Sequence, residues 1–272
     1  MRRGWPGRWW IQGPVCYGFY EGFEWVRSKL QGSRHDAVVN ALQVIHAERI
    51  LRLFHEARVE HWILPCAPAC QVATTPTLQR DAIRFWNVYY GLMHFAVPGL
   101  VLVFLFFKFP ERYRLWRNTA GAMLLLSLLG FWLYPVLPPR LLPAHYGFFD
   151  AAHLGGIGPI GKAEAGPLAN AYAAMPSLHI GWSSWCAFAV VPVVKRRWVK
   201  ALLIAHPFAT FFAVVVTANH YILDGAGGLA TLALAYLVAR PLTRAGRGDG
   251  RAREREDDTQ MADRTTTAPA AP

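Results

Sequence analysis

The chain has 272 residues, of which 54% are hydrophobic and 17% charged, with a formal net charge of +11 at pH 7. Soluble domains carry about 25% charged residues, so this composition excludes an ordinary soluble enzyme, a disordered chain and a disulfide-stapled miniprotein. Residues 85–107, 118–139 and 201–223 contain no charged side chain. Because about 20 apolar residues suffice for a helix to cross a bilayer, the sequence predicts an integral membrane protein.

The first part of the chain predicts one apolar segment and one surface helix. Residues 9–26 are apolar apart from two glutamates, and they lack the small-residue cleavage site of a removable signal peptide. In residues 36–62, apolar side chains recur at helical spacing and charged ones fill the intervening face. This pattern predicts an amphipathic helix, either on the membrane surface or packed as a solvated helix on the membrane domain. Glu48 and Arg52 are spaced for an ion pair on it.

The rest of the chain predicts five further spans and a polar tail. The spans are expected at residues 85–107, 118–136, 178–194, 201–218 and 222–240. With residues 9–26, this indicates an all-α fold: a polytopic membrane bundle of about six transmembrane helices plus the amphipathic surface helix. The tail has too little apolar surface to fold, so we expect a membrane-embedded domain at 1–240 and a disordered charged tail at 241–272.

The distribution of basic residues predicts the orientation. Clusters at 108–117 and 195–200 flank apolar spans, which favours the cytoplasmic side for both clusters and for both termini. Residues 137–177 and 218–222 then lie outside. This segregation points to the bilayer rather than nucleic acid as the partner. The arginine-rich basic content and the absence of recognisable eukaryotic sorting signals indicate a bacterial plasma membrane, while the oligomeric state stays open.

Two outer segments carry residues suited to catalysis. His220 and Asp224 lie four residues apart at the outer end of a span, so a helix would bring them onto one face. A carboxylate on one imidazole nitrogen fixes the tautomer and makes the other nitrogen a base or nucleophile. His179 follows Ser177, a good helix N-cap whose free first-turn amides could bind an anion. Arg140, on the same expected side, is suited to phosphate oxygens.

The other histidines have ordinary interpretations. His94 and His206 lie inside apolar spans, where a histidine bonded to a neighbouring helix is the usual case. His145 and His153 lie in the outer loop without an evident partner. Four more histidines, at positions 35, 46, 55 and 61, are interpreted as surface residues.

The order of these motifs resembles a known family. Pro-Pro-Arg140, then Met-Pro-Ser177-Leu-His179, then Asn-His220-x3-Asp224 is similar to the type 2 phosphatidic acid phosphatase superfamily. The chain looks closest to the branch containing inositol phosphorylceramide synthase, which the Asn87-x-Tyr89-x4-His94 element and the Glu48-Arg49 helix also resemble.

The resemblance implies a role for each matching residue. His220 would attack phosphorus and form a phosphohistidine, and Asp224 would orient His220. His179 would protonate the leaving alkoxide and then activate the acceptor, while Arg140, with Ser177, would bind the phosphate. The substrate would be a phospholipid or lipid phosphate. No cofactor and no metal are expected, and the few carboxylates of the outer segments (Asp150, Glu164 and Asp224) agree with this.

The sequence departs from the family pattern at two cations. Leu133 stands where the pattern has a lysine, and Val214 where it has an arginine. Either another cation, such as Lys162, replaces them, or the substrate is a phosphodiester with one charge less. The second option favours phosphotransfer over hydrolysis of a phosphomonoester, and the sequence leaves both reactions open.

Weaker signals allow alternatives. The glycine-rich stretch 155–161 lacks the context of a nucleotide loop and suggests a flexible or re-entrant loop. Cys66 and Cys70 are read as two buried thiols, with a disulfide or a zinc site as alternatives. The alternative function is a transporter or channel with the His/Asp pair as proton relay, which would string ionisable groups across the membrane. A purely structural membrane protein is the third option.

Overall fold

The computed structural model describes residues 9–71, 73–154 and 170–266, which are all-helical, as expected. The α-helices in this part of the chain are α1 (Trp9–Lys29), α2 (Arg34–Ile50), α3 (Glu56–Ile63), α4 (Thr77–Lys108), α5 (Pro110–Leu133), α6 (Leu178–Val190), α7 (Arg197–Val216) and α8 (Ile222–Thr266). Short 3₁₀ turns follow α5 at Pro139–Leu141, Ala144–Tyr146 and Ala151–Leu154.

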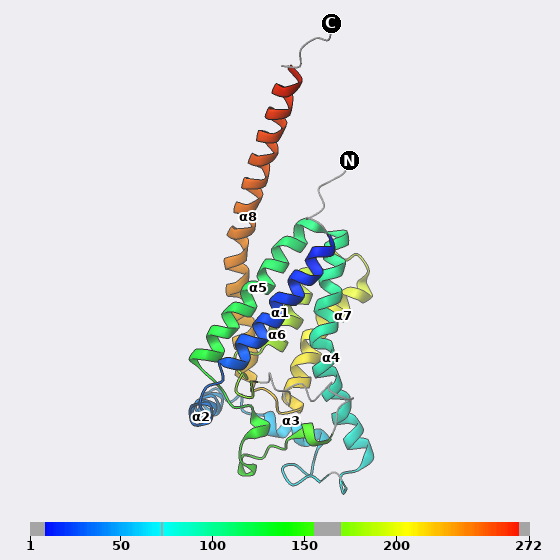
Figure 1. Cartoon of the computed structure of the whole chain (residues 1–272). Coiled ribbons are helices and arrows are strands. Elements are labelled where there is room, and N and C mark those ends of the chain that lie inside the picture. Colours follow the sequence, from blue (N-terminus) through cyan, green and yellow to red (C-terminus); the bar gives the residue numbers. More distant parts are fainter. Residues whose placement is uncertain (1–8, 72, 155–169, 267–272) are drawn as a thin grey trace.

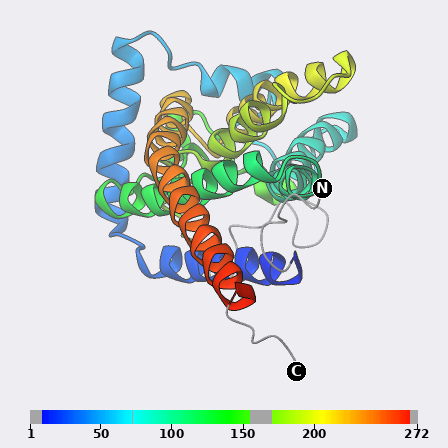
Figure 2. The same cartoon turned by 90° about the horizontal axis from the view of Figure 1, so that it is seen from above.

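Six of these described helices form a bundle, and α2 and α3 cover one of its ends. In Figure 1, α1, α4, α5, α6, α7 and the first half of α8 run between the top and the bottom of the view. Helices α2 and α3 lie across the bottom, and Figure 2 shows α2 along its length, at the edge of the bundle. The connections α4–α5 and α6–α7, which hold the basic clusters, lie at the opposite end.

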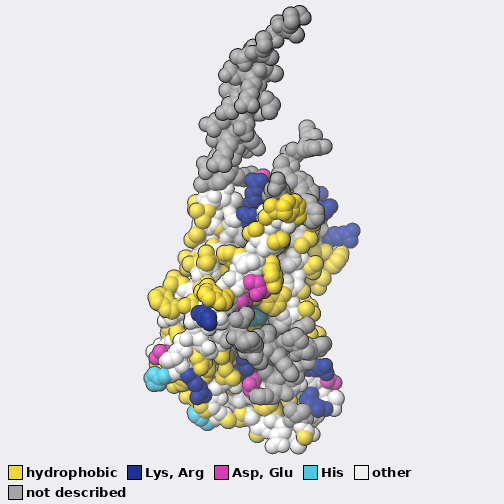
Figure 3. Space-filling model, viewed as in Figure 1, with side chains coloured by type: hydrophobic (Ala, Val, Ile, Leu, Met, Phe, Trp, Pro, Cys, Tyr) yellow, Lys and Arg dark blue, Asp and Glu magenta, His cyan; other side chains and the backbone are white. Residues whose placement is uncertain are grey.

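Within the described residues, three helices are long and apolar enough to cross a membrane. These are α4, α7 and the Ile222–Arg244 part of α8. Their outward side chains include Leu100, Phe208 and Leu237, each more than 60% exposed, and hydrophobic side chains cover much of the bundle in Figure 3. Helix α6 ends at Val190 rather than at residue 194 and has 13 residues, about 20 Å of helix. Crossing by α1, α5 and α6 therefore stays a prediction.

The expected surface helix 36–62 is two helices. The chain leaves the helical path at Arg52, whose φ is +57°, so α2 ends at Ile50 and α3 starts at Glu56. The residues of α2 that become buried are Ala37, Ala41, Val44, Ile45 and Glu48, a helical stripe that includes an acid. The predicted Glu48–Arg52 pairing is wrong, because Glu48 points inward and Arg52 lies in the turn.

Helix α8 continues through much of the segment for which we expect disorder. Its backbone is helical as far as Thr266 and extends beyond the bundle in Figure 1. Arginine, which has high helix propensity, is the most common residue at positions 241–266.

The bundle interior is apolar and aromatic away from α2 and α3. Trp116, Met123 and Trp185 belong to its largest buried cluster. The Trp185 ring N–H donates to the Trp116 carbonyl oxygen at 3.0 Å, so this buried polar group is satisfied.

The start of α6 packs closely on α8. A Cβ atom on Gly228 would overlap the carbonyl oxygen of Ser177, and the Ser177 N–H donates to the Asp224 carbonyl at 3.0 Å. Glycine is required here because backbone lies against backbone. The contact links the two segments that carry His179 and Asp224.

Candidate active site

A cavity of about 120 Å³ lies among α1, α4, α5, α6 and the segment before α8. Its lining includes Arg27, His94, His179 and His220. The structure therefore brings together two of the predicted catalytic residues and two residues to which the sequence analysis gave no role.

The α7–α8 turn fixes the position of His220. The backbone N–H groups of Asn219 and His220 both donate to the Val214 carbonyl, and Ala218 adopts φ +51°. His220 itself lies just before α8 rather than within a helix. Its side chain is directed by this turn into the cavity.

Two oxygen atoms lie close to the Nδ1 atom of His220. Nδ1 lies 2.8 Å from the Ala174 carbonyl oxygen and 3.4 Å from Asp224 Oδ2. Both are acceptors, so Nδ1 carries the proton and Nε2 keeps its lone pair. Nε2 is buried and has no hydrogen-bond partner among the described residues. The expected His220–Asp224 pairing is present, but a backbone carbonyl is the closer acceptor.

Three buried carboxylates accept from the first amides of α8. Asp224 Oδ2 accepts from the Tyr221 N–H at 2.9 Å. Glu56 Oε1 accepts from the Ile222 N–H at 3.0 Å and Glu48 Oε1 from the Leu223 N–H at 2.8 Å. All three acids have no exposed surface. They satisfy amides that a helix start leaves unpaired, and acids at this helix end are favourable.

The environment of Glu48 favours its neutral form. Burial, followed by the adjacent Glu56 carboxyl, raises the pKa of Glu48 to about 9, against the opposing hydrogen bond from Leu223. Sequence analysis put Glu48 and Glu56 on a polar face, and the sparse-carboxylate argument against a metal left them out. The expectation of a polar face is wrong for these two residues, since both are buried beside Asp224. The stripe Ala37, Ala41, Val44 and Ile45 continues to Glu48 at helical spacing and could have identified its burial.

His179 lies in the first turn of α6, as expected, between two rings of α4. It stacks on Tyr90 with ring centroids 3.9 Å apart and an interplanar angle of 20°. The His94 ring lies 4.1 Å away and the His220 ring 5.5 Å away, between centroids. Stacking fixes the plane of His179, and the two predicted catalytic imidazoles face one cavity.

The two histidines within apolar spans have different surroundings. His206 Nδ1 bonds to the Tyr89 hydroxyl at 2.8 Å, so the interpretation as a bonded core histidine is confirmed. His94 lines the cavity, and its Nδ1 is buried without a partner among the described residues. The interpretation of His94 as a bonded core histidine is wrong. The Asn87-x-Tyr89-x4-His94 element was the sequence signal that His94 belongs to the site.

Ser177 and Arg140 lie beside the cavity and are not among its lining residues. Ser177 is the N-cap residue of α6, but its side chain makes no capping hydrogen bond. Arg140 donates from Nε to Asn219 Oδ1 at 2.8 Å and from Nη1 to Asp150 Oδ1 at 3.1 Å. Arg140 is thus next to the His220 turn, with an acid partner.

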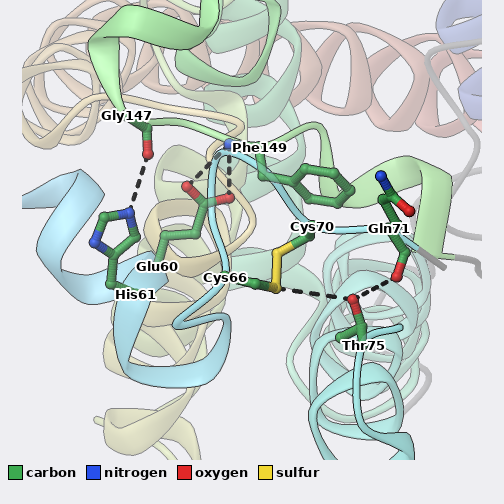
Figure 4. The surroundings of a disulfide bond; sticks show 8 residues. All are labelled: Glu60, His61, Cys66, Cys70, Gln71, Thr75, Gly147 and Phe149. Atoms are coloured by element: carbon green, nitrogen blue, oxygen red, sulfur yellow. Dashed lines mark hydrogen bonds between the residues drawn. A yellow bond between two sulfur atoms is a disulfide. The ribbon is translucent and has the colours of Figure 1, made fainter. Parts of the chain in front are cut away.

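The loop between α5 and α6 that carries Asp150 is bonded to α3 (Figure 4). Glu60 accepts from the Phe149 N–H at 3.2 and 3.3 Å, and His61 Nε2 donates to the Gly147 carbonyl at 3.2 Å. His61 is therefore more than a surface residue. Burial raises the pKa of Glu60 to about 8, against the lowering effect of the Phe149 hydrogen bond.

Cys66 and Cys70 form a disulfide in the α3–α4 connection (Figure 4). The reading as two buried thiols is wrong. The bridge lies at the same end of the bundle as α2 and α3. Lys162 and the glycine-rich stretch 155–161 lie outside the described residues, as does the side chain of His153.

Arg27 reaches the cavity from the last turn of α1. Its Nη2 donates to Glu24 Oε2 at 2.7 Å, and its Nε is buried without a partner among the described residues. Glu24 lines the cavity too. Nothing in the local sequence distinguishes Arg27 from other helix-end cations, so only the fold reveals it.

A comparison with protein-family models identifies a match over more than half of the chain. The model described as the PAP2 superfamily, the type 2 phosphatidic acid phosphatase superfamily, matches residues 42–238. The matched region contains the three cavity histidines and Asp224, the carboxylate beside His220. No curated protein and no solved structure matches the chain.

Proposed function

Because the chain belongs to the PAP2 superfamily of phosphatases and phosphotransferases, we propose that it cleaves a phosphate ester of a membrane lipid. The phosphoryl group passes through His220 to water or to an alcohol. The resemblance to the inositol phosphorylceramide synthase branch suggests a lipid alcohol as one acceptor.

One observation carries the proposal: His220 presents to the cavity an Nε2 atom that has no hydrogen-bond partner in the described part of the chain. The Ala174 carbonyl at 2.8 Å keeps the proton on Nδ1, so Nε2 is the nucleophilic atom. Asp224, at 3.4 Å, stabilises the positive charge that the ring gains once Nε2 is bonded to phosphorus.

In the first step, Nε2 forms a bond to phosphorus while the bond from phosphorus to the ester oxygen breaks. His179 donates a proton to the departing alkoxide. The two rings have centroids 5.5 Å apart, so both can contact one phosphate, with the nucleophile on one side of phosphorus and the leaving oxygen, which the acid protonates, on the other. An in-line displacement needs this order of groups.

In the second step, the now neutral His179 accepts a proton from water or an alcohol. The acceptor oxygen bonds to phosphorus as the Nε2–P bond breaks, which restores His220. Stacking on Tyr90 at 3.9 Å keeps His179 in one orientation for both proton transfers.

We propose that the site faces the extracytoplasmic side of a bacterial plasma membrane. The Cys66–Cys70 disulfide lies at the site's end of the bundle, and disulfides persist in oxidising compartments. The basic clusters lie at the other end, which the positive-inside rule assigns to the cytoplasm.

The clustering of the histidines favours an enzyme over a proton relay. His94, His179 and His220 surround one cavity instead of forming a chain across the bundle. A relay would need such a chain.

The test is turnover by the purified protein on a panel of lipid phosphates, with and without inositol or diacylglycerol as acceptor, read by mass spectrometry. We expect a released or transferred phosphate group, and no turnover by His220→Ala. A ³²P label from the substrate should become attached to His220 in the wild type. The matched control is His206→Gln, a histidine bonded to Tyr89.

Labelled phosphohistidine that persists in His220→Ala would refute the assignment of the nucleophile. Absence of turnover by the wild type on every lipid phosphate would refute the proposed activity as a whole.

A further inference from the structure

The site lacks two cations that the family pattern contains. Leu133 is 63% exposed, while Val214 is buried with Tyr90 and Ile180 in an apolar cluster. Neither residue belongs to the cavity lining. A phosphate in the cavity needs a cation from elsewhere.

Arg27 is in the right place to supply it. It lines the same cavity as His94, His179 and His220. Its backbone is held because its carbonyl accepts from Asn170 Nδ2 at 3.1 Å. The side chain is only 20% exposed.

Arg27 also has donors to spare. A guanidinium has five N–H donors in a planar fork. One bond goes to Glu24, while the Nε donor is buried without a partner in the described part of the chain. His220 Nε2 and His94 Nδ1 are likewise buried without a hydrogen-bond partner among the described residues. Three unpartnered polar atoms around one small cavity indicate a polar ligand, because buried polar groups normally have partners.

We propose that Arg27 binds the non-bridging oxygens of the substrate phosphate and is a catalytic residue of this site. This inference rests on the proposed function, and it assigns to α1 a part in the chemistry. Arg27 precedes residues 42–238, the region matched by the family model.

The acid partners of the two arginines define the substrate class. Arg27 is paired with Glu24 at 2.7 Å and Arg140 with Asp150 at 3.1 Å. Glu24 offsets much of the charge of Arg27, the arginine that lines the cavity, and Asp150 does the same for Arg140 beside it, so the site is only weakly positive. Such a site suits the single charge of a phosphodiester better than the double charge of a phosphomonoester. The preferred substrate is therefore a phosphodiester lipid.

The first experiment measures binding without turnover. The detergent-solubilised full-length protein is titrated with orthovanadate, and binding is read as the shift in Tm, since a ligand of the folded state stabilises it. Arg27→Gln should weaken binding by about 10- to 100-fold, the scale of a lost charge-assisted hydrogen bond. The matched control is Lys29→Gln, an exposed cation two residues away in the same helix turn.

The second experiment measures kcat/KM on phosphatidylinositol and on phosphatidic acid in mixed micelles. Arg27→Gln should lower kcat/KM on phosphatidylinositol by about 10- to 100-fold, Arg27→Lys should restore part of it, and Lys29→Gln should match the wild type. Glu24→Gln removes the competing carboxylate and should raise the relative rate on phosphatidic acid.

The outcomes separate the two proposals. Normal wild-type turnover with Arg27→Gln equal to Lys29→Gln would refute the role of Arg27 and leave the proposed function standing. Absence of wild-type turnover would refute the proposed function, while vanadate binding that depends on Arg27 would still support the anion site. If Arg27→Gln does not fold, Arg27→Lys and Glu24→Gln provide the test. The proposal is contradicted if both variants have the wild-type kcat/KM on both lipids.

Discussion

The two ends of the bundle interior are stabilised in different ways. Around the cavity, buried acids and histidines make directional hydrogen bonds to backbone groups, as Glu48 does to Leu223 at 2.8 Å. Toward the other end, Trp116, Met123 and Trp185 pack in an apolar cluster. Directional bonds depend on the identity of an atom, whereas apolar packing depends on volume. The cavity end should therefore respond to changes of a single atom that the apolar end tolerates.

Asp224→Asn is the sharpest single-atom test. The Ala174 carbonyl keeps the His220 tautomer, so the variant loses mainly the negative charge beside the phosphohistidine. Turnover should fall by about 10²- to 10³-fold, the scale of one lost electrostatic contact in a transition state. Steady-state kinetics give the rate, and circular dichroism checks that the fold is intact. A rate within threefold of the wild type would show that the carboxylate charge has no catalytic part.

Gly228→Ala and Gly99→Ala compare a glycine packed against a neighbouring backbone with a glycine that has free space around it. A Cβ on Gly228 meets the backbone of Ser177, whereas Gly99 has open space around it. Gly228→Ala should destabilise the protein by about 1–3 kcal/mol through overpacking. Gly99→Ala, in helix α4, should stabilise it by about 0.5–1 kcal/mol. Thermal unfolding in detergent measures both, and equal Tm values for the two variants would contradict the packing described at the α6–α8 contact.

The buried acids predict a pH dependence of stability. The folded-state pKa values of Glu48 and Glu60, about 9 and about 8, lie above the ordinary value of a glutamate. The folded state therefore binds more protons than the unfolded state across that interval, and stability should decline as pH rises from about 5 to 9. Tm measured across this range should show the decline.

The Glu60→Gln variant sharpens this test because its side chain is neutral at every pH. It should lose part of the decline in Tm, while Asp81→Asn, a change of an exposed acid, should follow the wild type. Parallel curves for Glu60→Gln and the wild type would mean that Glu60 does not titrate in this interval.

Met123→Leu should have the smallest effect. Met123 is fully buried in the apolar cluster, and volume-conserving apolar changes usually alter stability by less than about 1.5 kcal/mol. Turnover should match the wild type, since the change leaves every hydrogen bond around the cavity in place. Kinetics beside thermal unfolding would check both points, and a tenfold loss of turnover would mean that the two regions are coupled.

Sequence reasoning recovers the parts of the site that are local in the chain. The four-residue spacing of His220 and Asp224 predicts their proximity, and the Ser177 N-cap predicts where α6 begins. Both depend on geometry within one turn. The all-helical fold likewise follows from long uncharged segments.

The groups that sequence reasoning misses come from distant segments. Arg27 and Glu48 reach the site through tertiary packing, and each resembles an ordinary surface charge in its local sequence. The sequence also does not reveal the break between α2 and α3 at Arg52, because apolar residues keep their helical spacing on both sides of it. Only the fold distinguishes a buried acid at the start of a helix from a solvated one.

The redox state of Cys66 and Cys70 also reports the compartment that this end of the molecule enters. Their bridge closes a ring of five residues between α3 and α4, so its formation depends little on the rest of the fold. A chain whose site end enters an oxidising compartment would resist maleimide labelling at these positions until it is reduced. A chain held in a reducing compartment would be labelled at once, so two sulfur atoms can report the direction in which the whole bundle was inserted.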